Sequence, residues 1–460
     1  MSVDSLLFIS CFLPVILLLH WLIPGEKARN CILLAAGLLF CAFGSLTGLL
    51  LLLAVAGINC LLGRLILAGK KPKLFCTLAV VLDLGILVCF KYLNFLLSEV
   101  LGLPVGELGI AAPLGISFYI FKAVSYMVDT YRDRKSGTKR FGELLLYLSF
   151  FPQFIAGPIG RFGQFRSQLA ERHRAPEGIA KGLRRFLVGL GKKVILAGAL
   201  GTVADGVFGG SPELLDWHLA WVGAVAYMLQ LYFDFSGYSD MAIGLGKAFG
   251  FETPENFDYP YSAYSITDFW RRWHLSLSTW FRDYLYIPLG GNRKGTARTA
   301  LNKLTVFLFC GIWHGANWTF VLWGLWQGLF SALESTRVIR PRKNLLSGIY
   351  AMLVVCLGFV MFRAGTVAEG LQMIAAMFGF GARHATWSRE LLESLLTGEA
   401  VFVLTVSAVF AQPVLPRLKN TAVGRKVLEP ASWGLCLVLF VLCLAKLASG
   451  GFAPFIYARF

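Results

Sequence analysis

Apolar runs of about 20 residues recur along the whole chain, and they limit its possible folds more than any other feature. A helix needs about this length to cross the hydrocarbon core of a bilayer. Spans are expected at about 6–23, 31–44, 45–63, 74–95, 114–131, 184–200, 217–250, 299–317, 319–335, 346–363, 400–415 and 432–448, with Gly44-Ser45 breaking the long run at 31–63. Membrane β-strands would instead alternate over segments of about ten residues. We therefore predict an all-α polytopic membrane protein with about 11 to 13 membrane helices.

The composition supports this class. Hydrophobic residues make up 57% of the chain and charged residues 15%, whereas an average soluble domain is about a quarter charged. A soluble α/β protein with buried strands is the disfavoured alternative. The net charge of +17 would suit nucleic-acid binding, but the basic residues form short clusters between apolar runs, which is typical of positive-inside membrane topology. The cysteines form no CxxC pair, so the sequence indicates neither a metal site nor a disulfide framework.

The charge of the connecting segments predicts an orientation. Connections 63–73 and 132–140 are rich in bases, whereas 98–113 carries two glutamates and no base. Cytoplasmic connections carry the excess of Lys and Arg, so we expect both chain ends outside. The segment 143–160 has basic residues on both flanks and contains Pro152 and Pro158. It is therefore predicted to be re-entrant, with its irregular backbone covered by protein.

Two of the six histidines fall in the stretch 268–318, and each of them, His274 and His314, directly follows a tryptophan. A histidine at bilayer depth is a candidate functional residue, because imidazole exchanges protons near neutral pH. In a helix from Ser265, the cap, Asp268 would pair with Arg272 four residues on. One face would hold Phe269, Trp273, Leu277, Trp280 and Phe281, and the other Arg271, Arg272, His274, Ser278 and Arg282. A solvated or headgroup-facing polar surface is the alternative interpretation of that second face.

His314 is the stronger catalytic candidate. The small residues Gly311, Gly315 and Ala316 surround it and let a backbone or a substrate approach closely. Asn317 is placed to fix the tautomer of the imidazole. The sequence contains no GxSxG, HExxH or P-loop motif. A buried histidine base in a polytopic membrane protein suits deprotonation of a hydroxyl group for acyl transfer.

Asp234 and Asp240 lie within an otherwise apolar segment, among serines and tyrosines. Two interpretations of these carboxylates stay open. Either a helix end dips into the cytoplasmic interface, or the two acids line a polar cavity.

Five segments of the chain resemble the membrane-bound O-acyltransferase (MBOAT) family, and within it the bacterial branch that acetylates exopolysaccharides such as alginate. They read LGISFYIFKAVSYMVDTYR, FPQFIAGPIGR, DFSGYSDMAIG, FWRRWHLSLSTWFRDYLYIPLGGNRKG and GIWHGANWTFVLWG. The resemblance implies one integral membrane domain over 1–460, with N-terminal helices in 1–110, a motif core in 111–335 and C-terminal helices in 336–460. It also implies a ring of tilted helices around a thin central pore.

The resemblance further implies that His314 matches the catalytic histidine of the family and His274 its second histidine. Asp268, Arg272, Trp313, Asn317, Asp234 and Asp240 are the expected supporting residues.

The expected reaction moves an acyl group, most readily acetyl, from a cytoplasmic donor to an extracytoplasmic polysaccharide, directly or through a partner acetyltransferase. The donor, acetyl-CoA or an acyl carrier, is a substrate, and no tightly bound cofactor is expected. The location would be a bacterial plasma membrane. D-alanyl transfer in teichoic-acid modification is the alternative within the family, and a polytopic transporter without covalent chemistry is the alternative outside it.

Overall fold

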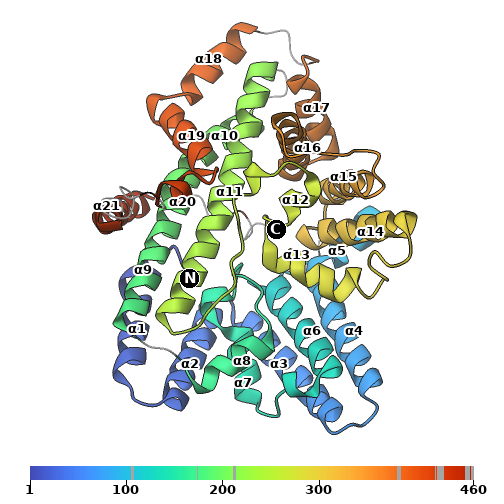
Figure 1. Cartoon of the computed structure of the whole chain (residues 1–460), viewed down its shortest axis with the longest axis vertical. Helices are drawn as coiled ribbons and strands as arrows, with labels where there is room; N and C mark the ends of the chain where they lie inside the picture. Colours follow the sequence, from blue (N-terminus) through green and yellow to red (C-terminus); the bar gives the residue numbers. More distant parts are fainter. Residues whose placement is uncertain are drawn as a thin grey trace. The chain divides into compact units, whose positions relative to one another are not determined.

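The computed structural model of the chain describes residues 1–104, 108–172, 175–210, 214–380, 385–419, 421, 429–450 and 456, and every regular element in these residues is a helix (Figure 1). Among the described residues, six helices are long and apolar enough to cross a membrane, or seven if the bent pair Trp387–Leu395 and Gly398–Phe410 is one span. The predicted all-α polytopic membrane fold is confirmed. The larger expected number of membrane helices stays a prediction, since it counts shorter helices such as the 17-residue α6 (Ile116–Arg132).

Contacts divide the chain into two compact units. Unit 1 comprises Met1–Phe186 and Ser239–Glu255, and unit 2 comprises Leu187–Tyr238 and Asn256–Phe460. The expectation of one membrane domain over 1–460 stays a prediction.

Unit 1 begins with a run of apolar helices. These are η1 (Phe8–Phe12), α1 (Leu13–Leu22), α2 (Glu26–Gly44), α3 (Leu46–Leu67) and α4 (Pro72–Lys91). The predicted break at Gly44-Ser45 is confirmed: Ser45 is extended, and its side chain accepts a hydrogen bond from the backbone N–H of Gly48. A serine cap of this kind starts a new helix where the apolar pattern alone runs on. The rest of unit 1 contains α5 (Leu93–Phe95), η2 (Leu96–Val100), α6, η3 (Arg134–Ser136), α7 (Phe141–Ser149), η4 (Phe151–Gln153), α8 (Phe162–Ala170) and most of α9 (Pro176–Gly191).

The segment predicted to be re-entrant does not form a spanning helix. α7 has nine residues, a length of about 14 Å, and the short turn η4 and irregular backbone follow it through residue 161. The Tyr147 hydroxyl donates a hydrogen bond to the Gly160 carbonyl at 2.8 Å, and Lys122 Nζ donates to Gln153 Oε1 at 3.3 Å. Phe150, Phe151 and Phe154 are buried. This backbone is covered by protein, as expected, and its entry and exit on one side of the membrane stay a prediction.

Unit 2 contains the central stretch and the remaining helices. They are η5 (Lys192–Ala197), α10 (Gly198–Phe208), most of α11 (Trp217–Ala248), η7 (Pro260–Ser262), α12 (Ile266–Trp270), α13 (Leu275–Phe281), η8 (Arg282–Tyr286), α14 (Thr296–His314), α15 (Trp318–Ser335), α16 (Leu345–Arg363), α17 (Val367–Met377), α18 (Ala385–Leu395), α19 (Gly398–Phe410), α20 (Val414–Lys419) and α21 (Glu429–Ala448).

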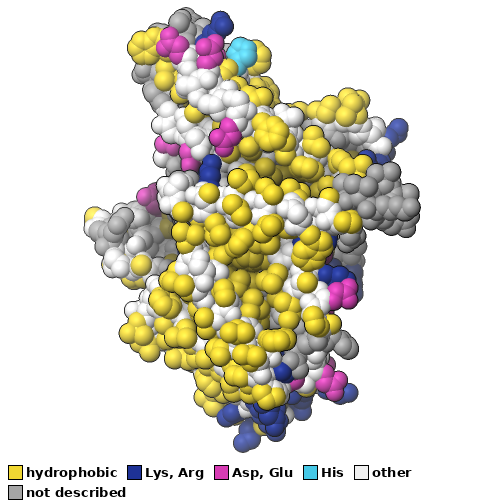
Figure 2. Space-filling model, turned by 90° about the vertical axis from the view of Figure 1, so that its left-hand side faces the viewer, with side chains coloured by type: hydrophobic (Ala, Val, Ile, Leu, Met, Phe, Trp, Pro, Cys, Tyr) yellow, Lys and Arg dark blue, Asp and Glu magenta, His cyan; other side chains and the backbone are white. Residues whose placement is uncertain are grey.

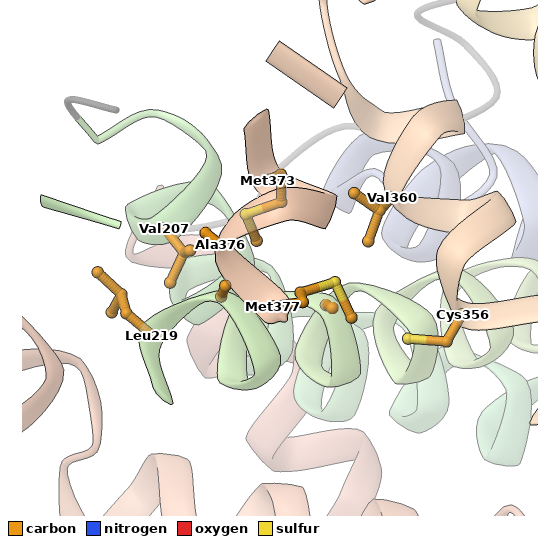
Figure 3. Close-up of a cluster of buried hydrophobic side chains, with 9 residues drawn as sticks. Val207, Leu219, Cys356, Val360, Met373, Ala376 and Met377 are labelled. Atoms are coloured by element: carbon orange, nitrogen blue, oxygen red, sulfur yellow. The ribbon is translucent and has the colours of Figure 1, made fainter. Parts of the chain in front are cut away.

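A buried hydrophobic cluster holds α16 in place within unit 2 (Figure 3). Cys356 and Val360 of α16 pack there with Val207 of α10, Leu219 of α11 and Met373 of α17. A second face of the same helix carries Phe359 and Phe362, which contact the central stretch. The cluster therefore fixes the helix that forms one wall of the candidate site.

The surface is apolar over much of the face that Figure 2 shows. Trp21 of α1, Phe43 of α2 and Leu50 of α3 are each about 60% exposed, and Phe402 of α19 is 67% exposed. Exposed apolar side chains on this scale suit contact with lipid rather than with water.

The predicted orientation can be tested by cysteine labelling. Lys135, in a base-rich connection, and Ser394, at the end of α18, are both exposed. We expect a membrane-impermeant maleimide added to intact cells to label Ser394→Cys and not Lys135→Cys, each in a background that lacks the ten native cysteines. Cell lysis should make Lys135→Cys reactive. Equal labelling of the two positions before lysis would contradict the orientation.

Candidate functional site

The central stretch forms two short helices, α12 and α13, and the prediction of a single helix from Ser265 is wrong. The chain turns between them, and His274 adopts a left-handed φ of 44°. Hydrogen bonds from outside the helix replace the helical ones here: Leu275 N–H donates to the Asn256 carbonyl at 3.0 Å, and Asp258 N–H donates to the Arg272 carbonyl at 2.9 Å. The segment before α12, which contains Asn256 and Asp258, thus stabilises the turn by hydrogen bonds to its backbone.

Three side chains fix the beginning of α12. Ser265 Oγ accepts from the Asp268 N–H at 2.9 Å, and Asp268 Oδ2 accepts from Arg272 Nε at 3.1 Å, so the predicted cap and ion pair are both present. Glu334, near the end of α15, accepts from the backbone N–H groups of Ile266 at 2.7 Å and Thr267 at 2.9 Å. A carboxylate at a helix N-terminus binds free N–H groups and complements the helix dipole. Sequence reasoning missed Glu334, because its partners lie 67 and 68 residues away.

His274 is buried, with 1% of its surface exposed. The predicted aromatic face is buried as well, from Phe269 to Phe281. The prediction that His274 lies on the polar face is wrong, because the left-handed turn separates its side chain from that of Arg271, which is exposed. The imidazole packs edge-on against Phe235 of α11, with ring centroids 4.6 Å apart, and its Nδ1 lies 3.2 Å from Oδ1 of Asn256. Asn256 is a second residue that sequence reasoning missed.

His314 is the last residue of α14 and is 4% exposed. Its ring packs edge-on against Trp323 of α15, at 4.9 Å between centroids, and against Phe362 of α16, at 5.1 Å. Asn317 does not hold this imidazole, contrary to our prediction. Its Oδ1 accepts from the Thr319 N–H at 3.0 Å, capping α15, and its Nδ2 donates to the Gly365 carbonyl at 2.9 Å.

The small residue Gly311 serves the packing of α14 against α15. A Cβ atom at Gly311 would lie 2.4 Å from the Phe320 carbonyl oxygen and 3.1 Å from Cα of Gly324. The close approach of these two backbones leaves no room for a side chain. The sequence left open whether the small residues admit a backbone or a substrate. Gly311 admits the backbone of α15.

Trp313 connects the two histidines. Its ring centroid lies 4.9 Å from that of His314 and 6.4 Å from that of His274. Both histidines thus belong to one buried, largely aromatic region of unit 2. The sequence showed only that they fall in the same stretch, 268–318. Their roles, and the thin central pore that the family resemblance implies, stay predictions.

Asp234 and Asp240 both form ion pairs. Asp234 is buried in the middle of α11 and pairs with buried Lys193 of η5, while its Oδ2 accepts from the Ile456 N–H at 2.9 Å. Asp240 Oδ1 lies 2.8 Å from Arg185 of α9 in unit 1. Asp234 does not lie at a helix end, because α11 continues to Ala248, and the choice between the membrane interface and a polar cavity stays open for both acids. Within the described residues, no group of three or more His, Cys, Asp and Glu side chains is arranged to hold a metal ion.

Comparison with known proteins places these residues in a family context. The model of the membrane-bound O-acyltransferase family matches residues 64–362, which include both histidines and all six expected supporting residues. The chain is 38% identical to a probable alginate O-acetylase of Azotobacter vinelandii, across 100% of both chains. It is 34% identical to a peptidoglycan O-acetyltransferase of Helicobacter pylori, across 85% of this chain and 82% of that one. A teichoic acid D-alanyltransferase of Streptococcus thermophilus is 30% identical over 47% of this chain and 55% of its own.

The family match covers well over half of the 460 residues, and the alginate relative aligns with the chain from end to end. Helices apolar enough to span a membrane and a buried pair of histidines agree with this match. The chain therefore belongs to the membrane-bound O-acyltransferase family and is an O-acyltransferase.

Proposed function

We propose that this enzyme transfers an acetyl group from a cytoplasmic thioester donor, acetyl-CoA or an acyl carrier, for O-acetylation of an extracytoplasmic polysaccharide. The polymer receives the group directly or through a partner acetyltransferase, and the enzyme works in a bacterial plasma membrane. The observation that carries the proposal is the 38% identity to a probable alginate O-acetylase over the whole of both chains. The D-alanyltransferase similarity covers about half of each chain and supports that alternative less.

In the proposed reaction, His314 is the general base. It removes the proton of an acceptor hydroxyl group while the hydroxyl oxygen attacks the thioester carbonyl. The C–O bond of the new ester forms, the C–S bond breaks, and the thiolate leaves and takes up the proton from His314. The rings of Trp323 and Phe362 surround the imidazole and keep water from competing with the acceptor hydroxyl. His274 assists without being the principal base.

Purified enzyme in lipid vesicles tests this proposal. With radiolabelled acetyl-CoA, we expect the wild-type enzyme to release CoA and label an added polysaccharide or partner protein, and His314→Ala to do neither. Cells with and without the gene should differ in the O-acetyl content of their surface polymer. A difference in D-alanine esters would instead identify the D-alanyl alternative, and donor that stays intact in every assay would favour a transporter.

Asp268 and Arg272 are expected to support the site without taking part in the chemistry. Asp268→Asn keeps the N–H that Ser265 binds and weakens only the pair with Arg272. Pairs of this kind contribute about 0.3–0.5 kcal/mol, so the variant should keep measurable transfer in the vesicle assay. Ser265→Ala, which removes the cap, should destabilise the protein more, by about 1 kcal/mol. Complete loss of transfer by a well-folded Asp268→Asn variant would show that this carboxylate takes part in catalysis.

A further inference from the structure

The side chain of Asn256 has a defined orientation. Asn256 is fully buried, and its Oδ1 lies 3.2 Å from the backbone nitrogen of Ser276 and 2.9 Å from Ser276 Oγ. A backbone N–H can only donate a hydrogen bond. The end of the amide that faces Ser276 is therefore the oxygen, and this contact decides a choice between O and N that amide groups otherwise leave open.

The same oxygen determines where His274 carries its hydrogen. Nδ1 of His274 lies 3.2 Å from Asn256 Oδ1, and two atoms at this distance form a hydrogen bond only if one of them has a hydrogen. The carbonyl oxygen has none, so Nδ1 carries it. A neutral imidazole has a single N–H, which leaves Nε2 with a lone pair.

The surroundings of His274 favour the neutral ring. The side chain is buried, and its hydrogen-bond partner among the described residues is the neutral amide of Asn256 rather than a carboxylate. An unpaired charge in such a place is strongly disfavoured. Nε2 itself has no hydrogen-bond partner among the described protein groups. It is thus a buried acceptor whose hydrogen-bonding capacity no described group of the chain uses.

The backbone adds an independent observation. His274 has a φ of 44°, a left-handed conformation that is costly for a residue other than glycine, and such strain is concentrated at functional sites. Two hydrogen bonds to the Asn256 region maintain it, from the Leu275 N–H to the Asn256 carbonyl and from the imidazole to the Asn256 side chain. Asn256 therefore sets the tautomer and, together with Asp258, holds the backbone turn.

We propose that Asn256 is a positioning residue that holds His274 in the Nδ1–H tautomer, so that Nε2 accepts a hydrogen bond from a hydroxyl group of the acceptor. The identity of the acceptor as a hydroxyl compound rests on the proposed function. In this tautomer, neutral His274 has no hydrogen to donate from Nε2 to the oxygen of the acyl group. Its assistance to His314 is therefore to bind and orient the hydroxyl-bearing substrate, and a polysaccharide offers several adjacent hydroxyl groups for this purpose.

The nitrogen NMR spectrum of enzyme labelled with ¹⁵N-histidine tests the tautomer without any substrate. The signals of His274 are assigned by their loss in His274→Gln. We expect a protonated-type shift for Nδ1 and an unprotonated type for Nε2 in the wild-type enzyme. Asn256→Asp, which keeps an oxygen at this place, should preserve the pattern, and Asn256→Leu should give a mixture. A protonated Nε2 in the wild-type enzyme would overturn the inference, and this spectrum decides even if Asn256→Leu does not fold.

Kinetics separate this inference from the proposed function. Asn256→Leu is expected to lower kcat/KM for transfer by about 10²-fold, the typical effect of a misplaced substrate, and Asn256→Asp should restore most of the loss. Ser276→Ala is the matched control. It removes the hydrogen bond from the Ser276 hydroxyl to Asn256 Oδ1 but keeps the one from the Ser276 backbone N–H. Its spectrum should match that of the wild type. If the tautomer is as expected but no acetyl group is transferred, the proposed function alone fails; if transfer occurs with the other tautomer, the inference alone fails.

Discussion

His314→Ala is expected to lower the rate of acyl transfer by about 10²–10⁴-fold or more, since a general base typically contributes a factor in this range. The expected loss follows from the role proposed for the imidazole, which takes the hydroxyl proton at the moment of attack. His314→Gln should do no better than His314→Ala, because an amide nitrogen cannot take up the proton. His274→Ala should lose less, since its assigned role is to orient the substrate.

The glutamine variant also separates chemistry from packing. The His314 ring fills space against Trp323 and Phe362, so His314→Ala leaves a small void that His314→Gln largely fills. His20→Gln is the matched control: His20 of α1 is another buried histidine with an aromatic neighbour, Phe249, but has no proposed role in transfer. We expect it to keep near-wild-type activity. The measurement is transfer by detergent-purified variants matched for monodispersity, and near-wild-type turnover of His314→Ala combined with an inactive His274→Ala would reverse the assigned roles.

Asp234→Asn is expected to lower the free energy of unfolding by about 3–5 kcal/mol, the typical result of removing one partner of a buried ion pair. The Lys193 side chain is fully buried and that of Asp234 is 6% exposed. Asparagine keeps the shape of the side chain but leaves the Lys193 charge without its carboxylate in a medium of low dielectric constant. Thermal or denaturant unfolding in detergent would measure the loss as a shift in the midpoint.

Asp240→Asn is the matched control on the same helix. The side chains of Asp240 and Arg185 are 16% and 29% exposed, and Arg185 also pairs with Glu255, so the expected loss is about 1 kcal/mol or less. The double variant Lys193→Met/Asp234→Leu should regain much of the stability that Asp234→Asn loses, because it removes both charges. Equal losses for Asp234→Asn and Asp240→Asn would show that the buried pair contributes no more than the partly exposed one.

Patterns within a few residues of one another were predicted well. The break at Ser45, the cap at Ser265 and the pair of Asp268 with Arg272 are all present. Each depends on groups three or four positions apart in the chain, and their geometry follows from the helix itself. The grouping of the aromatic side chains of α12 and α13 on one apolar face was also predicted, since it follows from helical periodicity. That this face is buried in protein rather than exposed to lipid was decided by the tertiary structure.

The conformation of His274 was not predictable in this way. A continuous helix satisfies the local pattern of 265–282 as well as the observed turn does. The turn forms because the Asn256 carbonyl and the Asp258 N–H, 14 to 19 residues earlier in the chain, bind the backbone of Leu275 and Arg272. Asn317 shows the same limit, because its side chain binds the Thr319 N–H and the carbonyl of Gly365, which lies 48 residues later in the chain.

The sequence by itself determined the membrane class, the helical fold and the two histidines around which the site is built, because hydrophobic run length and residue chemistry are properties of the chain. The tertiary structure decided which groups surround those histidines. Glu334 at α12, Asn256 at His274 and Lys193 at Asp234 lie 18 to 68 residues from their partners. Pairings at such separations depend on how the helices pack, since a buried polar group takes whichever partner the folded chain brings within hydrogen-bonding distance.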